Sequence, residues 1–133
     1  MTSHPQALEV VRGIYDAVGR GDWDGVLSRV HPAAVFTQSS ALPFGGEWRG
    51  HEGFRTMGDA IFKAWPDFSV RPLRFAQEGD VVLVVTRVDG SNPAGDGRLD
   101  QEMIEYWRVV DGQAVECRPF YFDPGKAAKS AGA

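Results

Sequence analysis

The chain has 133 residues, of which 24% are charged and 43% are hydrophobic, and its formal net charge is −4. This length is typical of one globular domain with a hydrophobic core of its own. The negative charge argues against nucleic acid or an anionic membrane as the main partner, because both attract basic surfaces. With one cysteine, Cys117, no disulfide can form within the chain.

Targeting and metal-binding signals are not found in this sequence. The first ten residues contain no basic segment followed by an apolar one, and no run approaches the ~20 apolar residues of a membrane span. We therefore expect no signal peptide, no membrane partner and a cytoplasmic location. His4, His31 and His51 share no helix or strand spacing, so we expect neither a metal site nor another cofactor.

Two helices are predicted in the first 32 residues. Ser3 and Gln6 form a capping-box pattern, and apolar residues then recur at helical spacing as far as Gly19. Asp22 is expected to cap a second, short helix, which Pro32 stops.

A strand, a loop and a third helix are predicted next. Residues 34–38 read as a short strand, and the proline- and glycine-rich residues 39–50 read as a loop. The third helix is expected over about His51–Trp65, with an apolar stripe that includes Met57, and Pro66 ends it.

The second half of the chain predicts four strands. They are expected at Phe68–Gln77, Val81–Asp89, Leu99–Val110 and Gln113–Phe122. Pro72 in the first of them indicates an edge strand or a bulge. The small, polar residues after about position 124 are expected to form a flexible tail.

The last two strands form a predicted hairpin around Asp111-Gly112, a sequence typical of a two-residue type I′ turn. Alternation along the first strand places Met103, Glu105 and Trp107 on one face. Alternation along the second groups Arg118 with Phe120. Both faces of the hairpin contain apolar residues, so we expect helices to cover one side and a partner subunit the other.

Helices followed by antiparallel strands indicate an α+β fold. Three helices over a strongly curved sheet leave a space between the two layers, and such spaces hold ligands.

The chain resembles the nuclear transport factor 2-like superfamily, in its SnoaL-like and ketosteroid-isomerase-like branch. The resemblance rests on "IYDAVGRGDWDGVLSRVHPAAVF", "EWRGHEGFRTM" and "IEYWRVVDGQAVECRPFYFD", and it extends over about residues 7–123. It implies a single domain over residues 1–133 and a cone-shaped α+β barrel, with three N-terminal helices packed on a strongly curved, mainly antiparallel sheet. It also implies a homodimer formed through the outer sheet face and a pocket for a small apolar molecule.

The resemblance also implies which residues face the pocket. The inward-facing residues are expected to include Met57, Leu83, Val85, Arg87, Met103, Glu105, Trp107, Arg118, Phe120 and Phe122. For substrate binding, the candidates are Tyr15, Phe36, Gln38, Met57, Met103, Trp107, Phe120 and Phe122.

A steroid isomerase of the best-known type does not fit these residues. The position of its general base falls on Gln38, which cannot take a proton, and the position of its tyrosine falls on Ile14, beside Tyr15. Of its catalytic acids, only the one in the oxyanion hole has an acidic counterpart here, Glu105.

The candidate catalytic residues are therefore Glu105, Arg87 and Arg118. Glu105 would act as the acid or base, and the two arginines would stabilise negative charge. The expected reaction is an isomerisation, cyclisation or hydration by proton transfer on a small apolar compound with a carbonyl or epoxide group, without a cofactor. A second acid could be Glu116 or Asp123.

Two alternatives stay open on the sequence. The three charged residues could form a structural ion-pair network, and the protein could bind a ligand or act as an accessory protein without catalysis.

Overall fold

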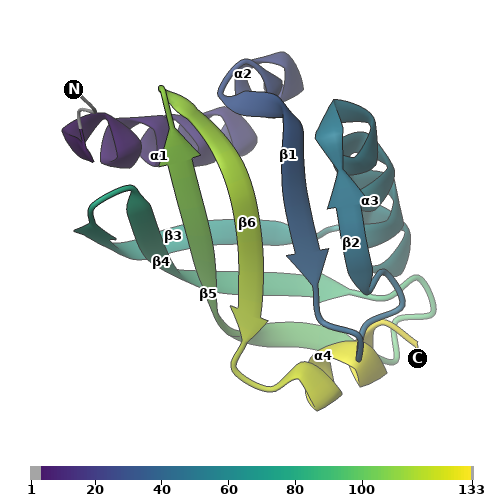
Figure 1. Ribbon diagram of the computed structural model, residues 1–133. Helices are drawn as coiled ribbons and strands as arrows, with labels where there is room; N and C mark the ends of the chain where they lie inside the picture. Colours follow the sequence, from purple (N-terminus) through teal and green to yellow (C-terminus); the bar gives the residue numbers. More distant parts are fainter. Residues whose placement is uncertain (1–3, 133) are drawn as a thin grey trace.

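The computed structural model describes residues 4–132 and has an α+β fold, in which four helices accompany a curved six-stranded sheet (Figure 1). The helices are α1 (His4–Gly19), α2 (Trp23–Leu27), α3 (Gly50–Ala64) and α4 (Pro124–Ser130). The strands are β1 (Val30–Gln38), β2 (Gly46–Arg49), β3 (Ser69–Glu78), β4 (Val81–Ser91), β5 (Arg98–Val110) and β6 (Gln113–Tyr121). None of the helices in residues 4–132 is long and apolar enough to span a membrane.

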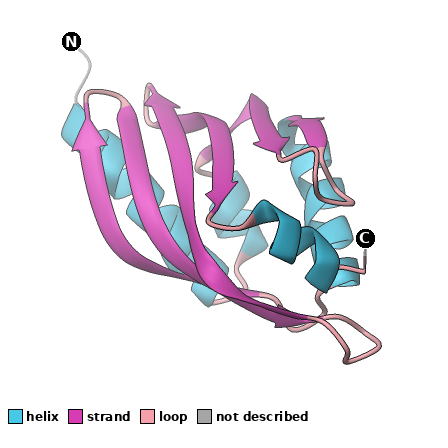
Figure 2. Ribbon diagram, turned by 90° about the horizontal axis from the view of Figure 1, so that it is seen from below, coloured by secondary structure: helices cyan, strands magenta, loops and turns pink. Residues whose placement is uncertain are grey.

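The strands follow the order β2-β1-β6-β5-β4-β3, and only β1 and β6 are parallel neighbours. The predicted antiparallel character of the sheet is thus confirmed. The sheet curls so strongly that β3 and β4 run across the direction of β1 and β6 (Figure 1). Helix α1 packs over β3, β4, β5 and β6, and α3 packs over β1 and β2. We call the sheet face under these helices the inner face, and the opposite one the outer face (Figure 2).

Three local predictions are confirmed. Asp22 caps α2, and its Oδ1 accepts a hydrogen bond from the Gly25 N–H at 2.9 Å. Pro72 lies in the edge strand β3, next to a register shift. Asp111 and Gly112 both have positive φ, as a type I′ turn requires. The capping residue expected at Ser3 lies outside the described residues.

The predicted facing of β6 was wrong, because a β-bulge follows the turn. Val109 pairs with Ala114, but Arg108 pairs with Glu116, so Val115 is an extra residue in β6. One extra residue moves every later side chain of that strand to the other face. Cys117, Pro119 and Tyr121 therefore lie opposite the inward residues of β5, and Arg118 does not.

The predicted facing of β4 was wrong by one residue as well. Val84 pairs with Glu105, and Thr86 pairs with Met103, so the even-numbered residues of β4 face inward. Leu83, Val85 and Arg87 are on the outer face instead. The run Val81–Val88 is apolar at both odd and even positions except at Thr86 and Arg87, so its composition did not indicate the facing.

Two elements were missing from the sequence prediction. Strand β2 forms inside the predicted loop, where Gly46–Arg49 pair with β1. Helix α4 replaces the predicted flexible tail: Asp123 caps it, accepting from the Lys126 N–H at 3.0 Å, and the Ser130 hydroxyl accepts a hydrogen bond from the buried Trp65 indole at 3.1 Å. This short segment has only a weak helical pattern, so its helix depends on tertiary contacts for stability.

Candidate functional site

A cavity of about 360 Å³ lies between helices α1–α3 and the inner face of the sheet. Apolar and aromatic side chains form most of its wall, and among the residues that the structure describes Glu105 is the only Asp, Glu, Lys, Arg or His that lines it. Seven of the predicted site residues line this cavity: Tyr15, Phe36, Gln38, Met57, Met103, Glu105 and Trp107.

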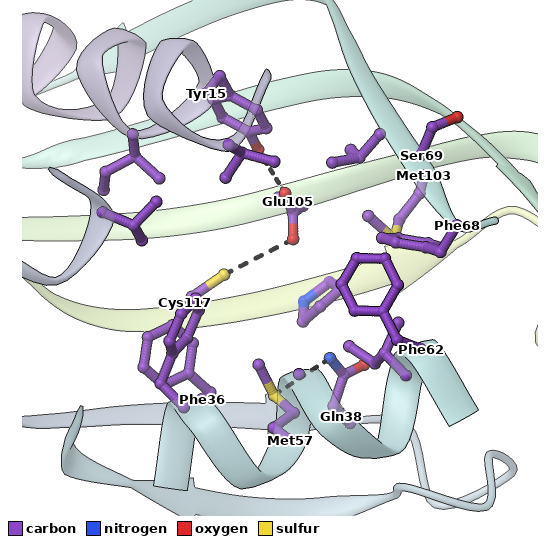
Figure 3. Close-up of a pocket in the computed structure, with 18 of the residues that line it drawn as sticks. Tyr15, Phe36, Gln38, Met57, Phe62, Phe68, Ser69, Met103, Glu105 and Cys117 are labelled. Atoms are coloured by element: carbon purple, nitrogen blue, oxygen red, sulfur yellow. Dashed lines mark hydrogen bonds between the residues drawn. The ribbon is translucent and has the colours of Figure 1, made fainter. Parts of the chain in front are cut away.

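Glu105 extends from β5 into the cavity and lies between side chains of α1 and β6 (Figure 3). The Tyr15 hydroxyl donates a hydrogen bond to Glu105 Oε1 at 2.5 Å. The Trp107 indole N–H in turn donates to the Tyr15 oxygen at 3.0 Å, and the Cys117 thiol lies 3.9 Å from Glu105 Oε2. Trp107 orients the Tyr15 hydroxyl, so its proton points at the carboxylate.

Burial raises the pKa of Glu105 above its ordinary value, while the hydrogen bonds from Tyr15 and Cys117 lower it by less. Burial is also the largest cause that raises the pKa of Tyr15 well above its usual range, and the neighbouring Glu105 charge adds to it. The same two causes raise the pKa of Cys117, and of Tyr121 on the same wall. Tyr15, Cys117 and Tyr121 therefore keep their protons at neutral pH, and Glu105 is the group placed to exchange one.

Replacement of Tyr15 tests this electrostatic account. In Tyr15→Phe the carboxylate loses a donor that stabilises its ionised form, so we expect the pKa of Glu105 to rise further. A ¹³C NMR titration of labelled glutamate carboxyl groups measures it. Tyr106→Phe, on the same strand as Glu105, is the control, because Tyr106 stacks with Arg118 outside the cavity. An unchanged or lower Glu105 pKa in Tyr15→Phe would contradict this account.

The two predicted catalytic arginines do not share the cavity with Glu105. Arg87 lies on the outer face of β4, where its Nη2 pairs with Asp100 Oδ1 at 2.7 Å. Arg118 also lies outside, with its Nε 3.3 Å from Glu116 Oε2 and its guanidinium 4.4 Å from the Tyr106 ring. The prediction that the three charged groups converge was wrong, and so was the alternative of one ion-pair network that joins them. In both β4 and β6, the residues that face inward are one position away from the predicted ones.

Two predicted binding aromatics and both candidate second acids also lie outside the cavity. Phe120 is 54% exposed on the outer face, and Phe122 follows β6 with 85% exposure. Glu116 pairs with Arg108 and Arg118, and Asp123 caps α4. None of these four residues lines the space around Glu105.

The sequence reading missed two groups of cavity residues. Cys117, Pro119 and Tyr121 line it because of the bulge at Val115. Trp23 and Phe62, both partly exposed, stack edge to face at its mouth with ring centroids 6.2 Å apart. Their partial exposure is seen only in the tertiary structure, so the sequence offered no signal for the mouth.

Among residues 4–132, no group of three or more His, Cys, Asp or Glu side chains is arranged to hold a metal ion. The cavity therefore offers a single carboxylate, neutral hydroxyl and thiol groups and an amide, in an apolar wall.

The family of the chain follows from a match to the family model described as "SnoaL-like domain", which covers residues 11–117. The chain belongs to the SnoaL-like domain family. That match includes the part of α1 that carries Tyr15, together with Glu105 and Cys117, and so most of the cavity wall. A comparison with curated proteins found no significant match.

Solved structures of other proteins have the same fold as this chain. An NTF2-like protein of unknown function from Burkholderia pseudomallei is similar over all of both chains, with 20% identity and a TM-score of 0.87. TerC, co-crystallised with polyporic acid, has 19% identity over 96% of this chain and 99% of its own, with a TM-score of 0.86. A putative SnoaL-like polyketide cyclase from Jannaschia sp. CCS1 has 22% identity over 92% of this chain and 90% of its own, with a TM-score of 0.76.

Proposed function

We propose that this SnoaL-like protein binds a small, largely apolar carbonyl or epoxide compound in the cavity and that Glu105 exchanges a proton with it. The single observation that carries the proposal is a carboxylate inside an apolar cavity, held by a tyrosine whose own proton is oriented by a tryptophan. Burying a carboxylate in an apolar wall costs stability. A functional role for Glu105 explains why the cavity contains one.

The chemistry follows from the raised pKa of Glu105. A base that is stronger than an ordinary carboxylate takes a proton more readily from carbon next to a carbonyl, and it stays able to return that proton. In this step Glu105 takes the proton, the C–H electron pair forms a C=C bond, and the π pair of the carbonyl moves onto its oxygen, which gives an enolate. The Tyr121 hydroxyl, which keeps its proton, lines the same cavity and is our candidate donor to that oxygen.

The apolar wall supports a ligand with one or more rings. Aromatic side chains from α2, α3 and β1 line the cavity together, among them Trp23, Phe54 and Phe36. Flat rings pack well against such walls. The crystal structure of TerC with polyporic acid, a protein of the same fold, also supports a small organic ligand for this one.

The test uses one ketone, 1-tetralone, and one epoxide, styrene oxide. Incubation of the ketone in D₂O should show loss of its α-proton NMR signal faster than in buffer with the heat-unfolded protein. For the epoxide, the readout is ring opening or isomerisation in the same NMR assay. Binding is followed through quenching of the tryptophan fluorescence, since Trp107 and Trp23 line the cavity. A protein that binds neither compound would contradict the proposal.

A ligand-binding role without catalysis is the second candidate. It is favoured by the absence of any second Asp, Glu, Lys, Arg or His among the described residues that line the cavity. Isomerases that work by proton transfer commonly pair their base with a second charged or acidic group. Saturable binding of 1-tetralone with no proton exchange above the background would favour this role.

We also propose that two copies pair through the outer face of the sheet. The proposal is supported by exposed apolar side chains that meet across strands: Ile104 is 42% exposed and pairs with Phe120 and Val85 in neighbouring strands. The pairs Arg87–Asp100 and Arg118–Glu116 bring both signs of charge to this face, so it can complement a second copy of itself.

A charged substitution tests the dimer. Ile104→Lys should convert the protein from dimer to monomer at micromolar concentration in sedimentation equilibrium, because burial of an unpaired ammonium opposes association. The control Glu102→Lys adds the same group on the same outer face at a position that is already exposed and charged. A wild type that is monomeric throughout this range would contradict the proposed dimer.

A further inference from the structure

Gln38 lies at the end of β1 and is 6% exposed, yet one end of its amide has no partner. The amide nitrogen lies 3.5 Å from the Met57 sulfur. A thioether sulfur only accepts hydrogen bonds, so the NH₂ group must be the end that faces it. This assignment leaves Oε1 turned away from Met57 (Figure 3), with no hydrogen-bond partner among the described residues.

Gln38 and Glu105 lie on strands that a single strand separates. Strand β6 lies between β1 and β5 in the sheet, and the pairing of β1 with β6 extends as far as Phe36 beside Cys117, two residues before Gln38. Pro119 of β6 pairs with Glu105. Gln38, Pro119 and Glu105 all line the cavity.

A buried carbonyl oxygen without a donor is rare in native proteins and destabilises them. Gln38 lines the cavity, so a molecule or water bound there can supply the missing donor. The rest of the wall near Gln38 is apolar, including Met57, Ile61 and Phe62. A ligand at this end of the cavity therefore gains most from presenting one donor and otherwise apolar surface.

We propose that Gln38 selects ligands that carry a hydroxyl or N–H group at the end opposite to the one that reacts with Glu105. The inference rests on the proposed function and narrows its substrate class to hydroxylated or amino-substituted ring compounds with a carbonyl group. Oε1 of Gln38 accepts the hydrogen bond from the ligand, while the Met57 sulfur holds the amide in this orientation.

Three ketones that differ at one substituent test the proposal: 6-hydroxy-1-tetralone, 6-methoxy-1-tetralone and 1-tetralone. Wild type should bind the hydroxylated ketone at least about tenfold more tightly than the methoxy one, which has no donor. In Gln38→Met, which keeps the side-chain length and removes the acceptor, the ratio should fall below about twofold. 1-Tetralone, which has no substituent at this position, gives the reference affinity for each variant, and the hydroxy-to-methoxy ratio is the quantity compared between variants.

Other outcomes separate this proposal from the proposed function. A wild type that binds all three ketones alike, or a Gln38→Met variant that keeps the preference, overturns the role of Gln38 and leaves Glu105 untouched. In Glu105→Gln the preference for the hydroxyl group should persist while proton exchange is lost. A wild type that binds none of the ketones overturns both proposals.

The melting temperature excludes a merely structural role. If the unpaired oxygen serves a ligand, Gln38→Met should melt at the same temperature as wild type or a few degrees higher, because a buried polar group has been removed. A lower melting temperature together with equal weakening of all three ketones would show that Gln38 supports the fold, and would overturn the proposal.

Discussion

Glu105→Gln is expected to lower the rate of α-proton exchange in 1-tetralone by at least about 100-fold, the usual contribution of a general base. The amide accepts the hydrogen bond from Tyr15 through its oxygen but cannot take a proton, so the geometry of the cavity is kept. Binding of the ketone should change by less than about threefold, since the two side chains have nearly the same shape. NMR exchange and fluorescence quenching measure the two quantities.

The matched control is Glu102→Gln, which makes the same chemical change on the same strand. Glu102 is exposed on the outer face, so its replacement should leave both exchange and binding unchanged. Exchange that survives in Glu105→Gln at the wild-type rate would remove Glu105 from the reaction and leave only a binding role for the cavity.

Glu105→Gln should also change how stability depends on pH. Because burial raises the pKa of Glu105 above its ordinary value of 4.5, the folded protein holds a proton in a range of pH where the unfolded chain has lost it. The wild type therefore loses stability as pH rises from 4.5 through the folded-state pKa. The variant lacks this loss. The free energy of unfolding of Glu105→Gln minus that of wild type should therefore increase over the same pH range and then level off.

Insertion of one alanine between Val115 and Glu116 is expected to abolish the folded state. If the turn and the one-residue bulge are kept, the added residue lies opposite Arg108 and every later residue moves by one position, which places Glu116 and Arg118 against the inward residues of β5. Each unpaired buried ion costs several kcal/mol, and Tyr121 would lose its place in the core, which together exceeds the ~5–15 kcal/mol that holds a typical domain folded. Circular dichroism should show no cooperative melting transition.

Val115→Ala is the control for this insertion, because it keeps the register and removes only part of a half-buried side chain. It should cost less than about 1.5 kcal/mol in the free energy of unfolding. An insertion variant that melts cooperatively near the wild-type temperature would show that the residue count at the bulge does not determine which face of β6 is buried.

Seven cavity residues could be predicted from the sequence, chiefly where a residue lies on an element with a clear pattern. Tyr15 and Met57 lie on amphipathic helices, and Met103, Glu105 and Trp107 alternate along β5, so their facing followed from local periodicity. Arg87 could not be placed this way, because β4 is apolar on both faces. The facing of Arg118 depended on one unpaired residue, which no turn pattern in the sequence reveals.

The sequence by itself determined three helices and five strands, their order and the turn at Asp111-Gly112, because helix periodicity, strand composition and turn chemistry act between residues close along the chain. Only the tertiary structure decided which side of β4 and β6 is buried and that residues 124–130 form a helix. Register is set by contacts between distant segments: Val84 against Glu105, Glu105 against Pro119, and Trp65 against Ser130. Those contacts put one carboxylate into the cavity and leave both arginines outside.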